Sequence, residues 1–354
     1  MPLNTDELAR VANAAIDLYA RNEAVDQITI EKPILTALKK GMKKFSGGQQ
    51  FYVEQIRKGN DSNGQTYQGN ANVTYNKRDP LAQAKWKWGN WHEGFTLNED
   101  ELAHAGIVIT DERSGGVSKA TKAELIQLSN LFDENIKSLR LGVEESLSKA
   151  LVLGTSWTAP GGFIAPGLDD LVSTTPNSGT VGGIDAAANS YWRNYAQTGL
   201  GVTLSVLLDA LELAYRSCRR RGGKPSAIWC GYSFYDALRN AVLAANVTAV
   251  QYKGGEGVTV DMSTKALMFR GIEIQWIPEF DDDFGGAVSP VIPYRKRCYI
   301  IDESSLTLRP LENNWMKMRT PGRAHDAYVY YYAMTSSWMM TCNRRNANAV
   351  ISIA

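Results

Sequence analysis

The sequence predicts an α+β fold with helices clustered in the middle of the chain and strands toward both ends. Three observations support this prediction: a polar segment over residues 46–80, a long helical pattern over residues 121–153, and short strand-like runs late in the 354-residue chain. A chain of this length accommodates two domains or one elaborated domain. The sequence contains no internal repeat.

The first two elements are helical patterns. Residues 5–21 carry one, in which Thr5 is placed to cap the helix and apolar residues fall on one face. A second is expected over residues 34–45, and its basic side chains are Lys39, Lys40, Lys43 and Lys44. A solvated basic face explains them, and contact with DNA phosphates by charge neutralisation alone is the alternative.

The polar segment has too few apolar residues to build a core. It predicts either a disordered insertion or a long two-stranded arm that packs on something else. On the returning limb, Trp86 and Trp88 alternate with Lys85 and Lys87, which is a strand period. Strands of about 24 residues in each limb would extend the arm to about 70 Å. A monomer gains little from so long a polar arm, whereas an oligomer can use it to reach its neighbours. We therefore expect Trp86, Trp88 and Trp91, with the two lysines, to contact neighbouring subunits. A stacking surface for sugars or single-stranded nucleic acid is the alternative.

The clearest element is the helical pattern of residues 121–153. Thr121 and Glu124 suggest a capping box, and leucines and other apolar residues then recur every three or four positions up to Leu151. Gly154 is placed to end the helix. At about 50 Å the helix is a strut, and its single apolar stripe suggests that it lies across a sheet.

Shorter elements follow. Helices are expected over residues 202–221 and 234–242, a buried strand over Ala227–Cys230, and a strand pair around Gly271. Five more strands complete the prediction, at residues 298–301, 306–308, 327–333, 339–341 and 350–353.

The composition is ordinary for a globular protein, with 44% hydrophobic and 21% charged residues. A formal net charge of +1 argues against sequence-specific reading of nucleic acid. The four cysteines form no CxxC pair and predict reduced, partly buried thiols. The sequence has no long apolar run and no signal-peptide pattern, so we expect no membrane contact and assembly in the cytoplasm.

No catalytic motif stands out. His92, His104 and His325 are dispersed, and three consecutive aspartates at residues 281–283 favour a solvated turn over a cation site. A glycine-rich stretch lacks the spacing of a phosphate-binding loop and is interpreted as a hairpin tip: Lys253, Gly254, Gly255, Glu256 and Gly257. We expect no catalytic residue, cofactor or metal, and hence no enzyme.

Several short phrases, taken in order, resemble one family. Residues 91–98 are similar to the returning limb of an extended loop, and residues 167–172, 182–185 and 191–194 to a phrase that follows a spine helix. Residues 269–274 and 343–353 are similar to two later strands. In this order they resemble the Hong Kong 97-type major capsid proteins of tailed double-stranded-DNA bacteriophages, over nearly the whole chain.

The resemblance implies the organisation of that fold. It would divide the chain into an N-terminal arm (residues 1–47), an extended β-hairpin loop (48–97), a P domain with the spine helix (98–160), an A domain with a central sheet flanked by helices (161–278), return strands of the P domain (279–335) and a closing strand (336–354). The hairpin tip at residues 253–257 would then lie near the five- and six-fold axes.

The resemblance also implies partners: hexamers and pentamers of the chain itself, packaged double-stranded DNA bound without sequence preference, a portal, a separate scaffolding protein and possible decoration proteins. The virion capsid is the expected location. Two alternatives stay open at this point. One is an encapsulin-type nanocompartment with the same fold, and the other is a tryptophan-rich protein that binds or acts on polysaccharides.

Overall fold

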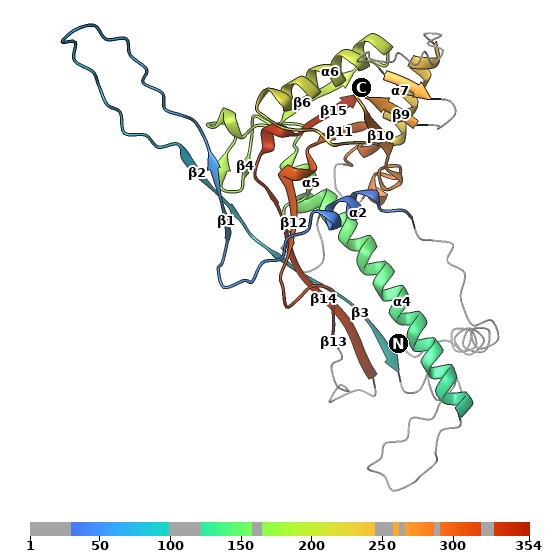
Figure 1. The fold of residues 1–354 in the computed structure, drawn as a ribbon. Helices are drawn as coiled ribbons and strands as arrows, with labels where there is room; N and C mark the ends of the chain where they lie inside the picture. The colour runs from blue at the N-terminus through green and yellow to red at the C-terminus, as the bar shows by residue number, and fades with distance from the viewer. Residues whose placement is uncertain are drawn as a thin grey trace. The chain divides into compact units, whose positions relative to one another are not determined.

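This computed structural model describes residues 30–98, 122–157, 165–244, 258–261, 266–286, 291–319 and 329–354. The chain forms two compact units (Figure 1). Unit 1 consists of Met1–Ile30, Asn90–Leu147 and Asn313–Ser337, and unit 2 of Glu31–Gly89, Ser148–Glu312 and Trp338–Ala354. The predicted helix at residues 5–21, the cap at Thr121, two of the histidines and the glycine-rich tip at residues 253–257 lie outside the described residues.

Unit 2 is built on a seven-stranded mixed sheet with the order β6-β15-β11-β7-β10-β9-β8. The strands are β6 (Tyr195–Leu200), β7 (Ala227–Cys230), β8 (Val258–Asp261), β9 (Ala266–Phe269), β10 (Ile272–Trp276), β11 (Arg297–Ile301) and β15 (Ala349–Ile353). The pairs β10–β7 and β15–β6 are parallel, and the other neighbours are antiparallel. Residues of β7, β11 and β15 are almost entirely buried, as their apolar sequences predict.

Two helices pack their apolar faces on this sheet, α6 (Leu204–Arg220) and α7 (Tyr232–Ala244). In α6, Leu207, Leu211, Ala214 and Cys218 recur every three or four residues and are all buried, which places one stripe in the core. These helices, β7 and the pair β9–β10 confirm the sequence prediction. The turn of that pair has a positive φ at both Arg270 (49°) and Gly271 (78°), as a two-residue hairpin requires.

The long helix α4 (Lys122–Leu153) is present as predicted, and its residues up to Leu147 belong to unit 1. Unit 1 also contains nearly all of β3 (Gly89–Asn98), together with β13 (Lys317–Arg319) and the first part of β14 (Val329–Cys342). Strand β14 pairs with both β3 and β13. Leu139 and Val143 of α4 form a small core with Met334. Within this unit the helix therefore lies on a sheet, which confirms the prediction from its apolar stripe.

The arm differs from its prediction. Strands β1 (Tyr52–Arg57) and β2 (Leu81–Trp86) form an antiparallel ladder, but residues 58–80 between them contain no strand. The prediction of two long strands is wrong because glycine, asparagine and aspartate dominate this stretch and have low strand propensity. Side chains hold its two limbs together instead: Asn63 Nδ2 donates to the Thr74 carbonyl at 3.0 Å, and the Asp79 N–H donates to Asp61 Oδ2 at 2.8 Å.

Two further boundaries need correction. The helix expected over residues 34–45 is α2 (Pro33–Lys40), and Phe45 instead forms a parallel bridge with Leu311. The strands expected at residues 327–333 and 339–341 are one strand, β14, which also pairs with β12 (Leu306–Pro310) in unit 2. The strand continues through the serines between the two predicted segments, where Ser336 Oγ accepts a hydrogen bond from the Met316 N–H at 3.0 Å. The remaining short elements are α5 (Leu168–Leu171), β4 (Thr180–Val181) and β5 (Ile184–Asp185).

Candidate assembly site

The tryptophans of the returning limb have three different positions. Trp86 is fully buried in unit 2, with its ring centroid 6.5 Å from that of Trp192 and its edge against Gly182, where an added Cβ would lie 3.1 Å from the ring. Its predicted contact with a neighbouring subunit is therefore wrong, because its own chain covers the ring. Strand alternation shows that one face is covered, but it does not show by which chain. Trp91, in β3 of unit 1, is half-buried.

Trp88 lies at the base of the arm in an aromatic pocket of about 180 Å³. Its ring centroid is 5.5 Å from that of Phe45, and Phe51 and Tyr52 line the same hollow. Lys87 is exposed and places its Nζ 5.4 Å from the Phe51 ring centroid, whereas Lys85 is exposed on β2. The half-exposed Trp88 and the exposed Lys85 and Lys87 are thus predicted arm residues that still offer a surface to a partner.

The far end of the arm carries apolar groups that the sequence analysis did not single out. Tyr75 is 91% exposed, Tyr67 is 73% exposed and Val73 is 43% exposed. The sequence feature that indicates them is an aromatic residue within a polar segment that has too few apolar residues to form a core. Such rings gain burial only from another molecule, so the arm tip is a second candidate contact surface.

The basic residues near α2 remain a possible surface for phosphate. Lys40, Lys43 and Lys44 are exposed, and Lys39 is half-buried. Lys39 and Lys40 occupy the last turn of α2, where the helix dipole favours cations. Helix geometry accounts for two of the four lysines, and the predicted contact with DNA stays a prediction.

Three of the family-like phrases meet in the interior of unit 2 around one guanidinium. Arg345 is 1% exposed and donates to the Leu171 carbonyl at 2.7 Å, the Trp192 carbonyl at 3.0 Å and Asn194 Oδ1 at 3.3 Å. Burial lowers the pKa of Arg345, and no carboxylate of the described residues forms an ion pair with it. Carbonyl dipoles stabilise this charge and join residues 167–172, 191–194 and 343–347.

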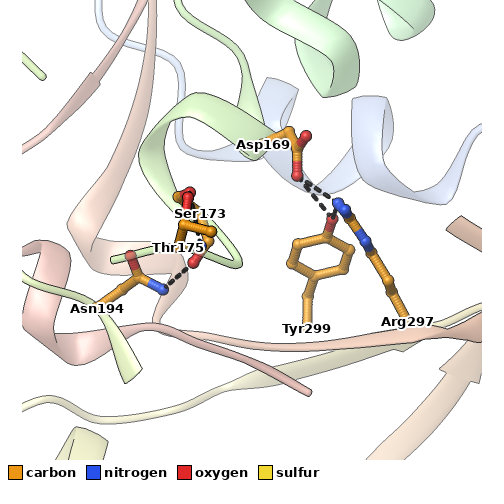
Figure 2. A network of polar contacts seen from close by, with 6 residues as sticks. All are labelled: Asp169, Ser173, Thr175, Asn194, Arg297 and Tyr299. Carbon is orange, nitrogen blue, oxygen red and sulfur yellow. Dashed lines mark hydrogen bonds and ion pairs between the residues drawn. The ribbon is translucent and has the colours of Figure 1, made fainter. Parts of the chain in front are cut away.

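A second buried pair lies beside these segments (Figure 2). Asp169 of α5 accepts hydrogen bonds from Arg297 Nη1 at 2.5 Å and from the Tyr299 hydroxyl at 3.2 Å, both on β11. Asn194 Nδ2 donates to the Ser173 carbonyl at 2.8 Å, which fixes the loop after α5. Burial raises the pKa of Tyr299, so its hydroxyl stays protonated and available as a donor. The network ties α5 to the sheet.

The end of α4 is fixed to the same phrase. Gly154 has φ +54° and approaches the Gly167 backbone so closely that a side chain on either residue would collide with the other. Asp170 accepts from the Gly167 N–H at 2.9 Å and from the Thr155 N–H at 2.8 Å, and burial raises its pKa. This confirms Gly154 as the residue that ends the long helix. Asp169 and Asp170, the two aspartates of residues 167–172, therefore both have hydrogen-bond partners within their own chain.

No group of three or more histidines, cysteines or acidic residues among the described residues is arranged to hold a metal ion. Asp283, from the predicted acidic turn, is buried and accepts from the Arg295 N–H at 3.0 Å. None of the helices described is long and apolar enough to span a membrane.

Comparison with known proteins gives matches at the level of structure. No protein-family model matches the sequence, and no curated protein matches it. The capsid asymmetric unit of cyanophage A-1(L) has a TM-score of 0.56 and 12% identity, covering 94% of this chain and 95% of that one. The capsid of a native GTA particle has a TM-score of 0.52 and 11% identity over 94% and 95% of the two chains. The capsid of Myoviridae phage XM1 has a TM-score of 0.52 and 12% identity over 95% and 98%.

The match extends over nearly the full length of each partner, although few residues are identical. The chain has the Hong Kong 97-type capsid fold that the order of its sequence phrases predicted.

Proposed function

We propose that this chain is the major capsid protein of a tailed double-stranded-DNA bacteriophage, a shell subunit that assembles with copies of itself into an icosahedral head. The observation that carries the proposal is the nearly complete coverage, in both directions, between this chain and capsid subunits. An arm that ends in exposed tyrosines supports it, because those rings have no core of their own to join. The role is structural rather than enzymatic.

The domain assignment follows from the same proposal. Residues 48–97 act as the extended loop, residues 98–160 and 279–335 as the P domain, and residues 161–278 as the A domain. The N-terminal arm is residues 1–47 and the closing strand is residues 336–354. Pentamers and hexamers are the expected assemblies, with double-stranded DNA inside. A portal, a scaffolding protein and decoration proteins stay predictions of the resemblance.

The two alternatives are less well supported. The matched structures described above are capsids of phages and of a GTA particle, which favours a phage head over an encapsulin shell. A polysaccharide-stacking surface would need the aromatic rings of the arm to be accessible together. Burial of Trp86 within its own unit removes one of them.

Sedimentation of the chain, purified alone and after co-expression with phage assembly proteins, tests the proposal. We expect a fast-sedimenting species of uniform size that electron microscopy resolves as closed shells. Avidity makes such shells stable even though each contact is weak. A chain that stays monomeric at all concentrations and salt conditions, with or without co-expressed phage assembly proteins, would refute a shell function.

A further inference from the structure

A basic hollow lies in unit 2 and is lined by the end of β1 and by the segment just before β15. The cavity is about 720 Å³ and includes five cationic side chains in its lining: Arg57, Lys58, Arg221, Arg344 and Arg345. No aspartate or glutamate is among the described residues that line it. This is a strong local charge on a chain whose formal net charge is only +1.

The cationic side chains of this hollow differ in the partners that their own chain gives them. Arg345 is committed to three internal acceptors. Lys58 pairs with Asp79. Arg344 Nη1 donates to the Gly222 carbonyl at 2.7 Å and Arg221 Nη1 to the Ser190 carbonyl at 3.4 Å, so backbone carbonyls orient both guanidiniums without cancelling their charge.

Arg57, the last residue of β1, is exposed, and its side chain forms no hydrogen bond or ion pair with the described residues. Three guanidiniums, two of them held in place, therefore face a concave space without a counter-charge. Planar guanidinium groups match carboxylates in a bidentate manner, and a pre-oriented pair loses little entropy on binding. A hollow of this size admits acidic side chains, whereas the convex backbone of a duplex would contact only its rim.

The same sequence holds the complementary charge. Residues 90–147 contain eleven acidic and five basic side chains, and Asp133 and Glu145 are exposed on α4. A subunit that is basic in one part and acidic in another suits a heterologous contact, in which one surface of each copy meets a different surface of the next. Such contacts close into rings.

We propose that this hollow, centred on Arg57, Arg221 and Arg344, binds acidic side chains of a neighbouring copy and helps set the register between subunits. The inference rests on the proposed shell function and adds a specific charged contact to it. Substitution of Arg57 is the most direct test, because its side chain forms no hydrogen bond or ion pair with the described residues of its own chain. Arg220 is the matched control: it is an exposed arginine next to Arg221 in sequence, also without an ion pair among the described residues, and it does not line the hollow.

Assembly yield is measured by sedimentation for the wild type, Arg57→Glu, Arg57→Lys and Arg220→Glu at equal concentration. We expect Arg57→Glu to lower the assembled fraction at least tenfold, Arg57→Lys to lie between this variant and the wild type because lysine keeps the charge but not the bidentate geometry, and Arg220→Glu to stay close to wild type. Denaturant unfolding of the subunits checks that each variant is folded. If Arg57→Glu is folded and assembles like the wild type, the inference is wrong while the shell function stands.

A binding measurement separates the inference from shell formation and from contact with nucleic acid. Labelled poly-L-glutamate should bind the unassembled chain, with at least fivefold weaker binding to Arg57→Glu and unchanged binding to Arg220→Glu. A duplex DNA fragment is the second probe. If the duplex rather than poly-L-glutamate requires Arg57, the hollow is a nucleic-acid contact and the proposal is overturned.

Discussion

Replacing Arg345 by methionine removes the guanidinium that joins three distant segments of unit 2. Two carbonyl groups and one amide oxygen then lose the buried donor that satisfies them. Each unsatisfied buried acceptor costs about 1–3 kcal/mol. Methionine is not charged, so the desolvation cost of the guanidinium disappears and offsets part of that loss. The expected net loss is about 3 kcal/mol of the unfolding free energy.

Urea denaturation of the unassembled subunit measures this loss, with tryptophan fluorescence as the signal. Arg344→Met is the matched control, because Arg344 is exposed and donates one hydrogen bond to the Gly222 carbonyl. We expect the control to change the unfolding free energy by less than about 1 kcal/mol. If Arg345→Met lowers the unfolding free energy no more than Arg344→Met does, the Arg345 guanidinium does not connect these segments, and the explanation of the family-like phrases is wrong.

Three further predictions concern the helix end, the buried thiols and the arm base. Gly154→Ala should lower the unfolding free energy by more than about 2 kcal/mol. Gly179 also has a positive φ (+83°) but has open space around it, so Gly179→Ala should lower it by only about 1 kcal/mol. Equal losses would mean that backbone strain, and not the close approach to Gly167, decides the effect. Burial raises the pKa of Cys218 from 9.0 to about 12, so the unfolded chain releases this proton first and stability should fall as pH rises from 9 toward 12. Cys218→Ala should make that fall shallower by about 1.4 kcal/mol per pH unit in denaturation titrations, and an unchanged slope would contradict the assignment. Trp86→Ala should destabilise the subunit by about 3–5 kcal/mol, while Trp88→Ala should leave it nearly as stable and lower shell yield; the reverse order in denaturation and sedimentation would sink the assignment of buried and accessible rings.

Sequence periodicity predicted the elements whose own residues decide their structure. The apolar stripe of α6 and the strand β7 follow directly from local spacing. The length of α4 was predictable for the same reason, and Gly154 marked its end. In each case the burial pattern repeats with the period of the element, so a single segment carries enough information.

Other features depend on partners that are distant in the chain. Trp86 alternates like an exposed strand stripe, yet Trp192 and Gly182, about a hundred residues later, bury it. Two strands were predicted where β14 is one, because the hydrogen-bond partners of the serines between them are not local. Arg345 is one of two adjacent arginines, and only the fold shows that one is buried and the other exposed. No periodicity distinguishes them.

For the arm, one prediction from the sequence was correct and another was wrong. Its polar composition predicted correctly that it adds little to the core of its own chain, since Tyr67 and Tyr75 remain exposed. Its ladder is nevertheless short, because side-chain hydrogen bonds rather than backbone pairing hold the limbs beyond β1 and β2. Composition therefore predicted the exposure of the arm but not how its limbs are held together.

Electron cryo-microscopy of the particles formed by the purified chain tests the central claim most directly. The account predicts closed icosahedral shells in which the arm of each copy contacts a neighbouring copy and its tip tyrosines become buried. Dispersed monomers, or open aggregates in which the arm contacts no other copy, would contradict it.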